Sequence, residues 1–259
     1  MKTMRLIALF LLTIALLVQA DSNVVSSANV VGYVQTDIVP GQYLLAGVNF
    51  TASGEEPTLK EVVGTNQLRE ASNYLEADRV VVFDADAAVY QAYAMYDGDH
   101  EFYPCNTLDE WNTGSATNPV LPVGSGFWIL PASGSTTTNS IYLDGDAVLD
   151  ASKDIALLNG YQLIAYPFSS DQAIATLNTS NLTAHANYLE ADRIVTFSTG
   201  QYQAYGLYTD ANWYPCNTLD EWNNAIAETD YVIAVGEGFW FIAYGGKTTT
   251  EPNKYLGNL

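Results

Sequence analysis

Two identical ten-residue blocks each hold several side chains that could do chemistry. The sequence YPCNTLDEWN runs from Tyr103 to Asn112 and recurs from Tyr214 to Asn223. Each block contains a thiol, adjacent carboxylates and a tryptophan, which suit disulfide formation, acid–base chemistry and stacking on a sugar or peptide. With one hairpin tyrosine from each half of the chain, the candidate ligand-binding residues are Trp111, Trp222, Tyr93, Tyr205, Asp109 and Asp220.

The same block also has a structural interpretation. Thr107 and Glu110 have the spacing of a capping box, and the intervening acidic residue would favour the positive end of a helix dipole. A proline, a cap and a tryptophan would then form a rigid corner from strand to helix, with the indole tucked under a sheet. The sequence alone is compatible with both interpretations, a structural corner and a ligand-binding cleft.

Cys105 and Cys216 occupy equivalent positions in the two blocks. A single cysteine in each half cannot form a disulfide within that half. The two can pair only if their Cα atoms approach within about 7 Å. Three alternatives stay open: a disulfide between the halves, two buried thiols, or cross-links between chains.

Paired aspartates indicate a calcium site in the first half only. Carboxylate oxygens are calcium ligands, and the second half has Ser198-Thr199 and Thr209-Asp210 at the positions of the two Asp-x-Asp pairs. Turn chemistry explains the aspartates as well, and we expect no other cofactor. The candidate ligands are Asp84, Asp86, Asp97 and Asp99.

Signs of catalysis are few. His100 and His185 do not correspond between the halves, and the chain has no Gly-x-Ser-x-Gly, His-Glu-x-x-His or phosphate-loop motif. We therefore expect a protein that is not an enzyme. Paired carboxylates could still hydrolyse a glycoside, because suitable separations arise from distant positions in a sequence.

The duplicated block belongs to a duplicated domain. The sequence NYLEADR, from Asn73 to Arg79, recurs from Asn187 to Arg193, and shorter matches such as Gly-x-Gly-Phe-Trp extend the register. An offset above 100 residues exceeds the period of a solenoid repeat. We divide the chain into a signal peptide at 1–20, repeat 1 at 21–143 and repeat 2 at 144–259, with the join at a turn beginning at Asp144.

Charge and leader indicate an exported, acidic protein. Lys2 and Arg5 precede a short apolar run ending at Val18-Gln19-Ala20, as in a secretory signal peptide. Without the leader, seven basic and 29 acidic residues give a net charge of −22. That charge repels nucleic acid, and no later stretch is long and apolar enough to span a membrane. We expect a secreted protein at the cell surface or outside the cell.

Residue patterns predict mainly antiparallel strands in each repeat. Residues 79–83 with 90–96, and 193–197 with 202–208, predict hairpins, and Thr58 with Glu61 predicts a short capped helix. Long strands are expected at 120–130 and 232–242, where internal glycines predict a bulge or a close backbone approach. The fold class expected is all-β, with two tandem sandwich-like or barrel-like domains.

These motifs resemble those of exported repeat proteins of Verrucomicrobia-like bacteria. The resemblance rests on the segment from Gly160 to Phe168, the Ala-Asp-Arg strand, the tyrosine-rich hairpin and Gly-x-Gly-Phe-Trp. The resemblance covers nearly all of the chain after the leader. Similar motif patterns also resemble modules in secreted Bacteroidetes proteins. The resemblance implies a bacterial, exported, β-rich module, with no catalytic residues to carry over. Repeat 1 departs from the pattern at Gly41-Gln42-Tyr43 and Val48-Asn49-Phe50.

Three functions follow as hypotheses. The first is an extracellular structural or surface-associated protein that self-associates into larger arrays. The second is a carbohydrate-binding protein that uses Trp111, Trp222 and the hairpin tyrosines. The third is a glycosidase-like enzyme with two carboxylates in one cleft.

Overall fold

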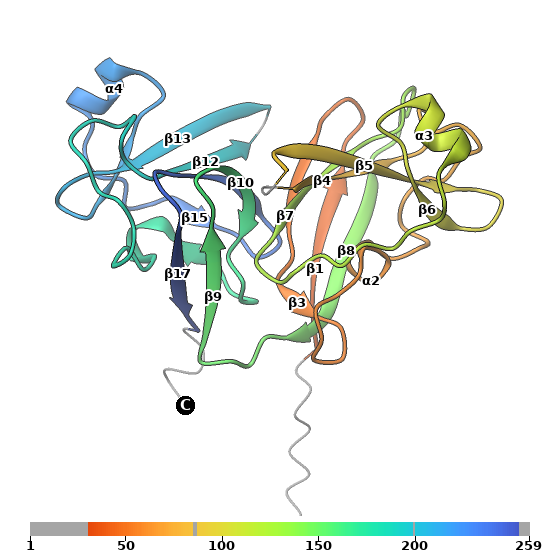
Figure 1. Ribbon diagram of the computed structural model, residues 1–259, viewed down its shortest axis with the longest axis horizontal. Helices are drawn as coiled ribbons and strands as arrows, with labels where there is room; N and C mark the ends of the chain where they lie inside the picture. The colour runs from red at the N-terminus through yellow and green to blue at the C-terminus, as the bar shows by residue number, and fades with distance from the viewer. Residues whose placement is uncertain (1–30, 85–86, 199, 254–259) are drawn as a thin grey trace, which may run out of the picture. The chain divides into compact units, whose positions relative to one another are not determined.

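The computed structural model describes residues 31–84, 87–198 and 200–253, which form an all-β structure with short helices. Figure 1 shows the strands of the two repeats side by side, with a short helix at the outer end of each. In repeat 1 the elements are β1 (Val31–Ile38), β2 (Leu44–Gly47), β3 (Phe50–Thr51), α2 (Leu59–Val63), β4 (Arg79–Asp84), β5 (Val89–Tyr96), β6 (Glu101–Pro104), α3 (Leu108–Thr113), β7 (Gly126–Leu130) and β8 (Asn139–Ala147). In repeat 2 they are β9 (Ser152–Leu157), β10 (Gly160–Ala165), β11 (Gln172–Ala173), the 3₁₀ turn η1 (Ile174–Thr176), β12 (Arg193–Ser198), β13 (Gln201–Leu207), β14 (Trp213–Pro215), α4 (Leu219–Asn224), β15 (Val232–Ile233), β16 (Gly238–Ala243) and β17 (Lys247–Pro252).

Each repeat builds a five-stranded antiparallel sheet and a smaller one. The large sheets have the orders β2-β7-β4-β5-β6 and β10-β16-β12-β13-β14, which match strand for strand when the shared sequence blocks are aligned. The smaller sheets are β1-β8-β3 and β17-β9, and repeat 2 has in addition the two-stranded sheet β11-β15. No sheet of the described residues closes into a barrel, so the sandwich-like alternative is the one observed.

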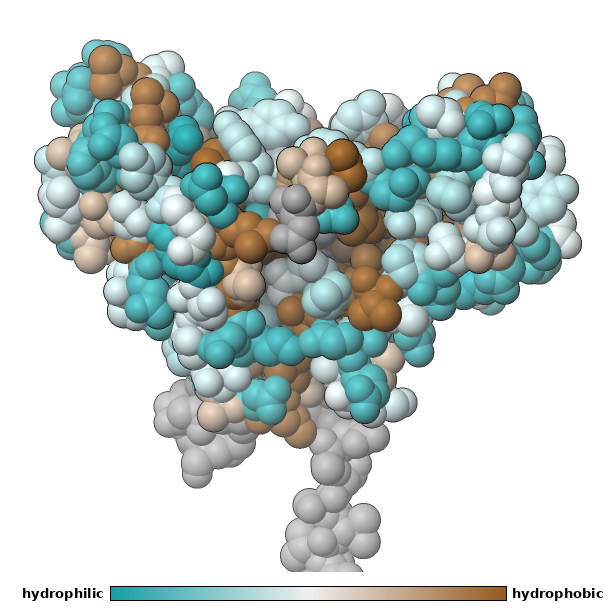
Figure 2. All heavy atoms as spheres, viewed as in Figure 1, coloured by the Kyte–Doolittle hydropathy of each residue, from teal (hydrophilic) through white to brown (hydrophobic). Residues whose placement is uncertain are grey.

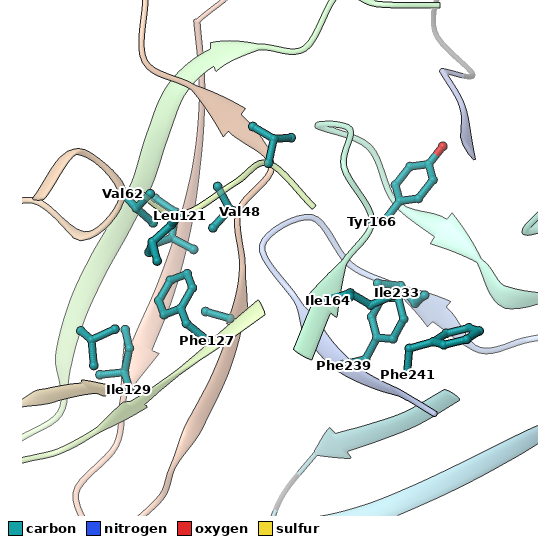
Figure 3. Close-up of a cluster of buried hydrophobic side chains, with 14 of the residues drawn as sticks. Val48, Val62, Leu121, Phe127, Ile129, Ile164, Tyr166, Ile233, Phe239 and Phe241 are labelled. Atoms are coloured by element: carbon teal, nitrogen blue, oxygen red, sulfur yellow. The ribbon is translucent and has the colours of Figure 1, made fainter. Parts of the chain in front are cut away.

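The core lies between the large and small sheets. In repeat 1, Val80 of β4 and Phe127 of β7 face Ile141 and Leu143 of β8, and all four are almost fully buried. Figure 3 shows that this cluster continues into repeat 2, where Phe239 belongs to the same set. Alternate residues along each strand point to opposite faces of its sheet, so β4, β7, β8 and β16 each direct one apolar face into this core.

Local sequence signals explain the short elements. β4 and β5 pair as an antiparallel hairpin, as do β12 and β13, which confirms both predicted hairpins. Helix α2 begins after Thr58 because the Glu61 carboxylate accepts hydrogen bonds from the Thr58 backbone N–H (2.8 Å) and hydroxyl (2.6 Å). It ends at Gly64, whose φ of 64° is open to glycine at little cost.

Two expectations about strands were wrong. The run 120–130 is not one strand, because Ser125 N–H donates to Pro122 O in a turn and β7 begins only at Gly126. Likewise β15 and β16 are separate strands.

The turn expected from Asp144 is instead part of β8, where Asp144 pairs with Tyr33 of β1. The join at Asp144 therefore falls inside a paired strand.

Within the described part of the chain, no helix has the length and apolar character needed to cross a bilayer.

Candidate functional site

The duplicated block forms a capped corner in both repeats. Thr107 precedes α3, and its hydroxyl accepts a hydrogen bond from Glu110 N–H at 3.1 Å. The Glu110 carboxylate in turn accepts from Asn106 N–H at 2.8 Å. Thr218 and Glu221 make the equivalent bond at 3.0 Å ahead of α4. The corner expected from the capping spacing is therefore present in both copies.

Both block tryptophans are buried under these corners. The side chains of Trp111 and Trp222 are only 9% and 7% exposed. Their indole N–H groups donate to Ser72 O at 3.2 Å and Ala186 O at 2.8 Å. A buried, hydrogen-bonded indole offers no open face to a ligand, so the stacking role expected for these two residues is corrected. Three tyrosine rings flank each indole, namely Tyr74, Tyr96 and Tyr103 for Trp111 and Tyr188, Tyr208 and Tyr214 for Trp222.

The other four predicted ligand-binding residues do not meet in one site. Asp109 and Asp220 are exposed in the first turns of α3 and α4, which lie at opposite outer ends of the two repeats (Figure 1). Tyr205 is buried, at 6% exposure. Tyr93 alone lines a cleft between the repeats.

The two cysteines are free thiols, so the disulfide expected as one alternative is absent. Each corner follows the outermost strand of its large sheet, β6 or β14, whereas the repeats meet near the opposite edges, where β2 and β10 lie. Cys105 and Cys216 are therefore buried separately. Burial raises the pKa of each thiol to about 12.

The predicted calcium ligands serve as turn residues where they are described. Asp84 accepts a hydrogen bond from Ala87 N–H at 3.0 Å, and Asp99 accepts from Glu101 N–H and the Tyr103 hydroxyl. Asp97 is exposed, and Asp86 lies outside the described residues. Among the residues that the structure describes, no three His, Cys, Asp or Glu side chains gather as a metal site.

The repeats contact one another through backbone groups related by a pseudo-twofold axis. Gly47 N–H donates to Gly236 O, and the equivalent Ala165 N–H donates to Gly124 O, both at 2.8 Å. Isolated bridges join Ala46 to Glu237 and, symmetrically, Ser125 to Ile164. The close backbone approach predicted from the internal glycines is thus an approach between repeats.

An aromatic band crosses this interface. Trp128 of repeat 1 packs on Phe197 of repeat 2, with ring centroids 5.0 Å apart, and Trp240 packs on Phe83 at 5.2 Å. Each phenylalanine also contacts a hairpin tyrosine, and each tryptophan contacts a tyrosine from the turn before β2 or the start of β10. We define the aromatic band as Tyr43, Phe83, Tyr90, Trp128, Tyr161, Phe197, Tyr202 and Trp240.

The tyrosines of the band are its exposed part. Tyr43, Tyr90, Tyr161 and Tyr202 are between 46% and 59% exposed, whereas Trp128 is buried. Burial raises the pKa of Tyr90, and the neighbouring Tyr202 adds to the shift. The two hairpin tyrosines thus lie close enough to influence each other across the axis.

Two clefts flank the band, in equivalent positions on either side of the interface. Cleft A, of about 570 Å³, lies between β1 residues 34–37 and residues 231–237. Cleft B, of about 720 Å³, lies between β9 residues 153–156 and residues 121–126. Figure 2 shows hydrophobic residues gathered in the hollow between the repeats, with hydrophilic residues on either side.

The polar groups in the clefts differ. In cleft A, Glu237 accepts hydrogen bonds from the Tyr231 hydroxyl and from Ala234 N–H, and burial raises its pKa. Cleft B contains an ion pair between Lys153 and Glu56 at 2.8 Å. It also contains Asp84, Gln91, Tyr93 and Gln162. The shared backbone therefore holds two chemically distinct clefts.

Sequence reasoning identified the hairpin tyrosines as a possible stacking surface but missed the contacts of Trp128 and Trp240 across the interface, and the clefts. The signal was available in Gly-x-Gly-Phe-Trp, since both the glycines and the tryptophans of that motif lie at the interface. The chain matches no protein-family model, and no curated protein or solved structure is significantly similar to it.

Proposed function

We propose that the protein is an exported carbohydrate-binding protein that binds neutral sugar chains on the aromatic band. The observation that carries this proposal is the row of exposed tyrosines across the repeat interface. A pyranose ring presents C–H groups on its faces and hydroxyl groups at its edge. Tyrosine suits both, because its ring is apolar and its hydroxyl is a hydrogen-bonding group.

The band is held in place before any ligand binds. Phe83 supports Tyr90 with ring centroids 4.9 Å apart, and Phe197 supports Tyr202 at the same distance. The reciprocal tryptophan contacts then fix each phenylalanine from the other repeat. Rings ordered in this way lose little further freedom on binding, which favours affinity.

The surrounding polar groups and the net charge favour sugars over other ligands that stack on aromatic rings. Cleft B supplies amide and carboxylate groups at Gln91, Gln162 and Asp84 next to the band, and such groups exchange hydrogen bonds with sugar hydroxyls. The bases of nucleic acid also stack on aromatic rings, but a net charge of −20 repels their phosphates.

Affinity electrophoresis in gels that contain neutral glucans, xylans or mannans tests this proposal. We expect retardation by at least one polysaccharide, weakened about tenfold in a Tyr90→Ala/Tyr202→Ala variant if each lost ring contributes about 0.5 to 1.5 kcal/mol. Tyr33→Ala is the matched control, because Tyr33 is 71% exposed on β1 outside the band. Equal retardation of all three proteins would contradict the proposal, as would no retardation by any polymer.

A structural, self-associating role is the second candidate, and the open edge of β1 favours it. β1 pairs with β8 on one side, and no described strand pairs with its other side. An unpaired strand edge is a template for another chain. Light scattering over a range of concentrations, with and without calcium, tests this role: a constant monomer mass would exclude it.

A further inference from the structure

A buried ion pair of repeat 2 has no counterpart among the described residues of repeat 1. In repeat 2, the Asp192 side chain is fully buried. The Lys247 ammonium lies 2.7 and 2.9 Å from its two carboxylate oxygens and also donates to the Thr183 hydroxyl. The pair lies between the loop before β12 and the start of β17.

Asp78 is the counterpart of Asp192 and is held in the same way. Its carboxylate accepts hydrogen bonds from Arg69 N–H at 2.9 Å and Ala132 N–H at 2.7 Å. Asp192 accepts the two equivalent bonds at 2.7 and 2.6 Å. Asp78 is 4% exposed, so the same burial and the same backbone donors position both carboxylates.

Strand register identifies what replaces the lysine. Lys247 pairs with Leu157 at the start of β17, and Asn139 pairs with Ile38 at the start of β8. The shorter Asn139 side chain donates to Gln67 O instead. Among the described residues, no lysine or arginine forms an ion pair with Asp78.

A pocket of about 450 Å³ occupies this position in repeat 1. Asp78 lines it together with residues 66–69 and 134–139, which include a serine, three threonines and the exposed Arg69, which forms no ion pair with Asp78 in the structure. The segment 133–138 that forms one wall is longer than Gly245-Gly246, which connects the equivalent positions in repeat 2. The pocket therefore combines a buried carboxylate with hydroxyl groups from the wall segment, whereas the position of Thr183 itself is taken by Arg69.

We propose that this pocket binds a primary alkylammonium group, the group carried by a lysine side chain of a partner. A buried carboxylate without a cation is unfavourable, and an ammonium forms short, charge-assisted hydrogen bonds to it. Repeat 2 supplies the precedent within the same chain, because Lys247 pairs there with Asp192, the carboxylate equivalent to Asp78. The net charge of −20 also draws cations toward the protein.

Titration calorimetry with Nα-acetyl-lysine methylamide tests the proposal. We expect saturable binding with one site per chain and a Kd of about 1 mM, and no binding of the Nε-acetylated form, which lacks the charge. Asn139→Lys should place a tethered ammonium on Asp78, weakening binding more than about tenfold while raising the melting temperature. Ser140→Lys is the matched control and should bind as the wild type does, because the Ser140 hydroxyl bonds to Asp37 on the surface.

Asp78→Asn should also abolish binding, but it disturbs two backbone hydrogen bonds and can unfold the protein. If Asp78→Asn does unfold, Asn139→Lys still decides the test, because it leaves Asp78 and its backbone hydrogen bonds in place. Absence of saturable binding to wild-type protein would overturn the proposal, as would equal binding by wild type and Asn139→Lys. Equal binding of the charged and the acetylated probe would show that the ammonium is not recognised, with the same consequence.

Discussion

Gly238→Ala should destabilise the protein by disrupting the contact between the repeats. An ideal Cβ at Gly238 would overlap Ala46 O and lie 2.9 Å from the Ala46 carbonyl carbon. Both atoms belong to the backbone of β2, which cannot rotate away as a side chain can. Overpacking at a rigid contact costs about 1 to 3 kcal/mol, and the upper end applies here because the obstructing atoms are main chain. For a domain of this size, about 3 kcal/mol lowers the melting temperature by about 6 to 12 °C.

Gly246→Ala, in the connection between β16 and β17, is the matched control. A Cβ there would have no neighbour closer than 3.9 Å. Removing glycine restricts the unfolded chain, so this variant should be neutral or more stable by up to about 1 kcal/mol. Differential scanning calorimetry of the two variants and the wild type measures the difference. Equal melting temperatures for Gly238→Ala and Gly246→Ala would refute the inferred close approach.

Three further predictions concern buried groups. Cys105 and Cys216, whose pKa values burial raises to about 12, should resist a thiol reagent at pH 8 in the folded protein and give two thiols per chain after unfolding without reductant. Lys247→Met should lower the free energy of unfolding by about 3 to 5 kcal/mol in urea titrations, because it leaves the Asp192 carboxylate buried without its cation. Glu237 has a folded-state pKa above its ordinary 4.5, so the native state retains its proton longer than the unfolded chain does. This group's contribution to stability therefore falls as pH rises from about 4.5 through the raised pKa, and Glu237→Gln should reduce that fall, measured as the urea midpoint at pH 4.5 and 7.

Short-range structure followed from the sequence because its causes are local. The cap at Thr58 depends on a carboxylate three residues away, and both hairpins depend on strands joined by short turns. The predicted corner around Trp111 was right for the same reason. In contrast, Asp144 in Asp-Gly-Asp has the composition of a turn, and its pairing with Tyr33 on a distant strand makes it part of β8.

The candidate site was not predicted as a whole, because its parts meet only after the repeats pack. Trp128 contacts Phe197, and Trp240 contacts Phe83. No periodicity within one repeat encodes a contact with the other. The tyrosines were recognised as a possible stacking surface, but the identical blocks drew attention to Trp111 and Trp222, which are conspicuous in sequence and buried in the structure.

Duplication makes each repeat a reference for the other, and this changes where function is to be sought. Features that both copies keep, such as the corner around Trp111 and the glycines at the interface, are explained by the fold they share. Side chains that differ between equivalent positions of the two repeats are not explained by the shared fold. Asp78 and Asp192 have equivalent backbone donors, yet within the described part of the chain only Asp192 pairs with a lysine. Such differences point to binding chemistry that the shared fold does not explain, in addition to the aromatic band that both repeats build.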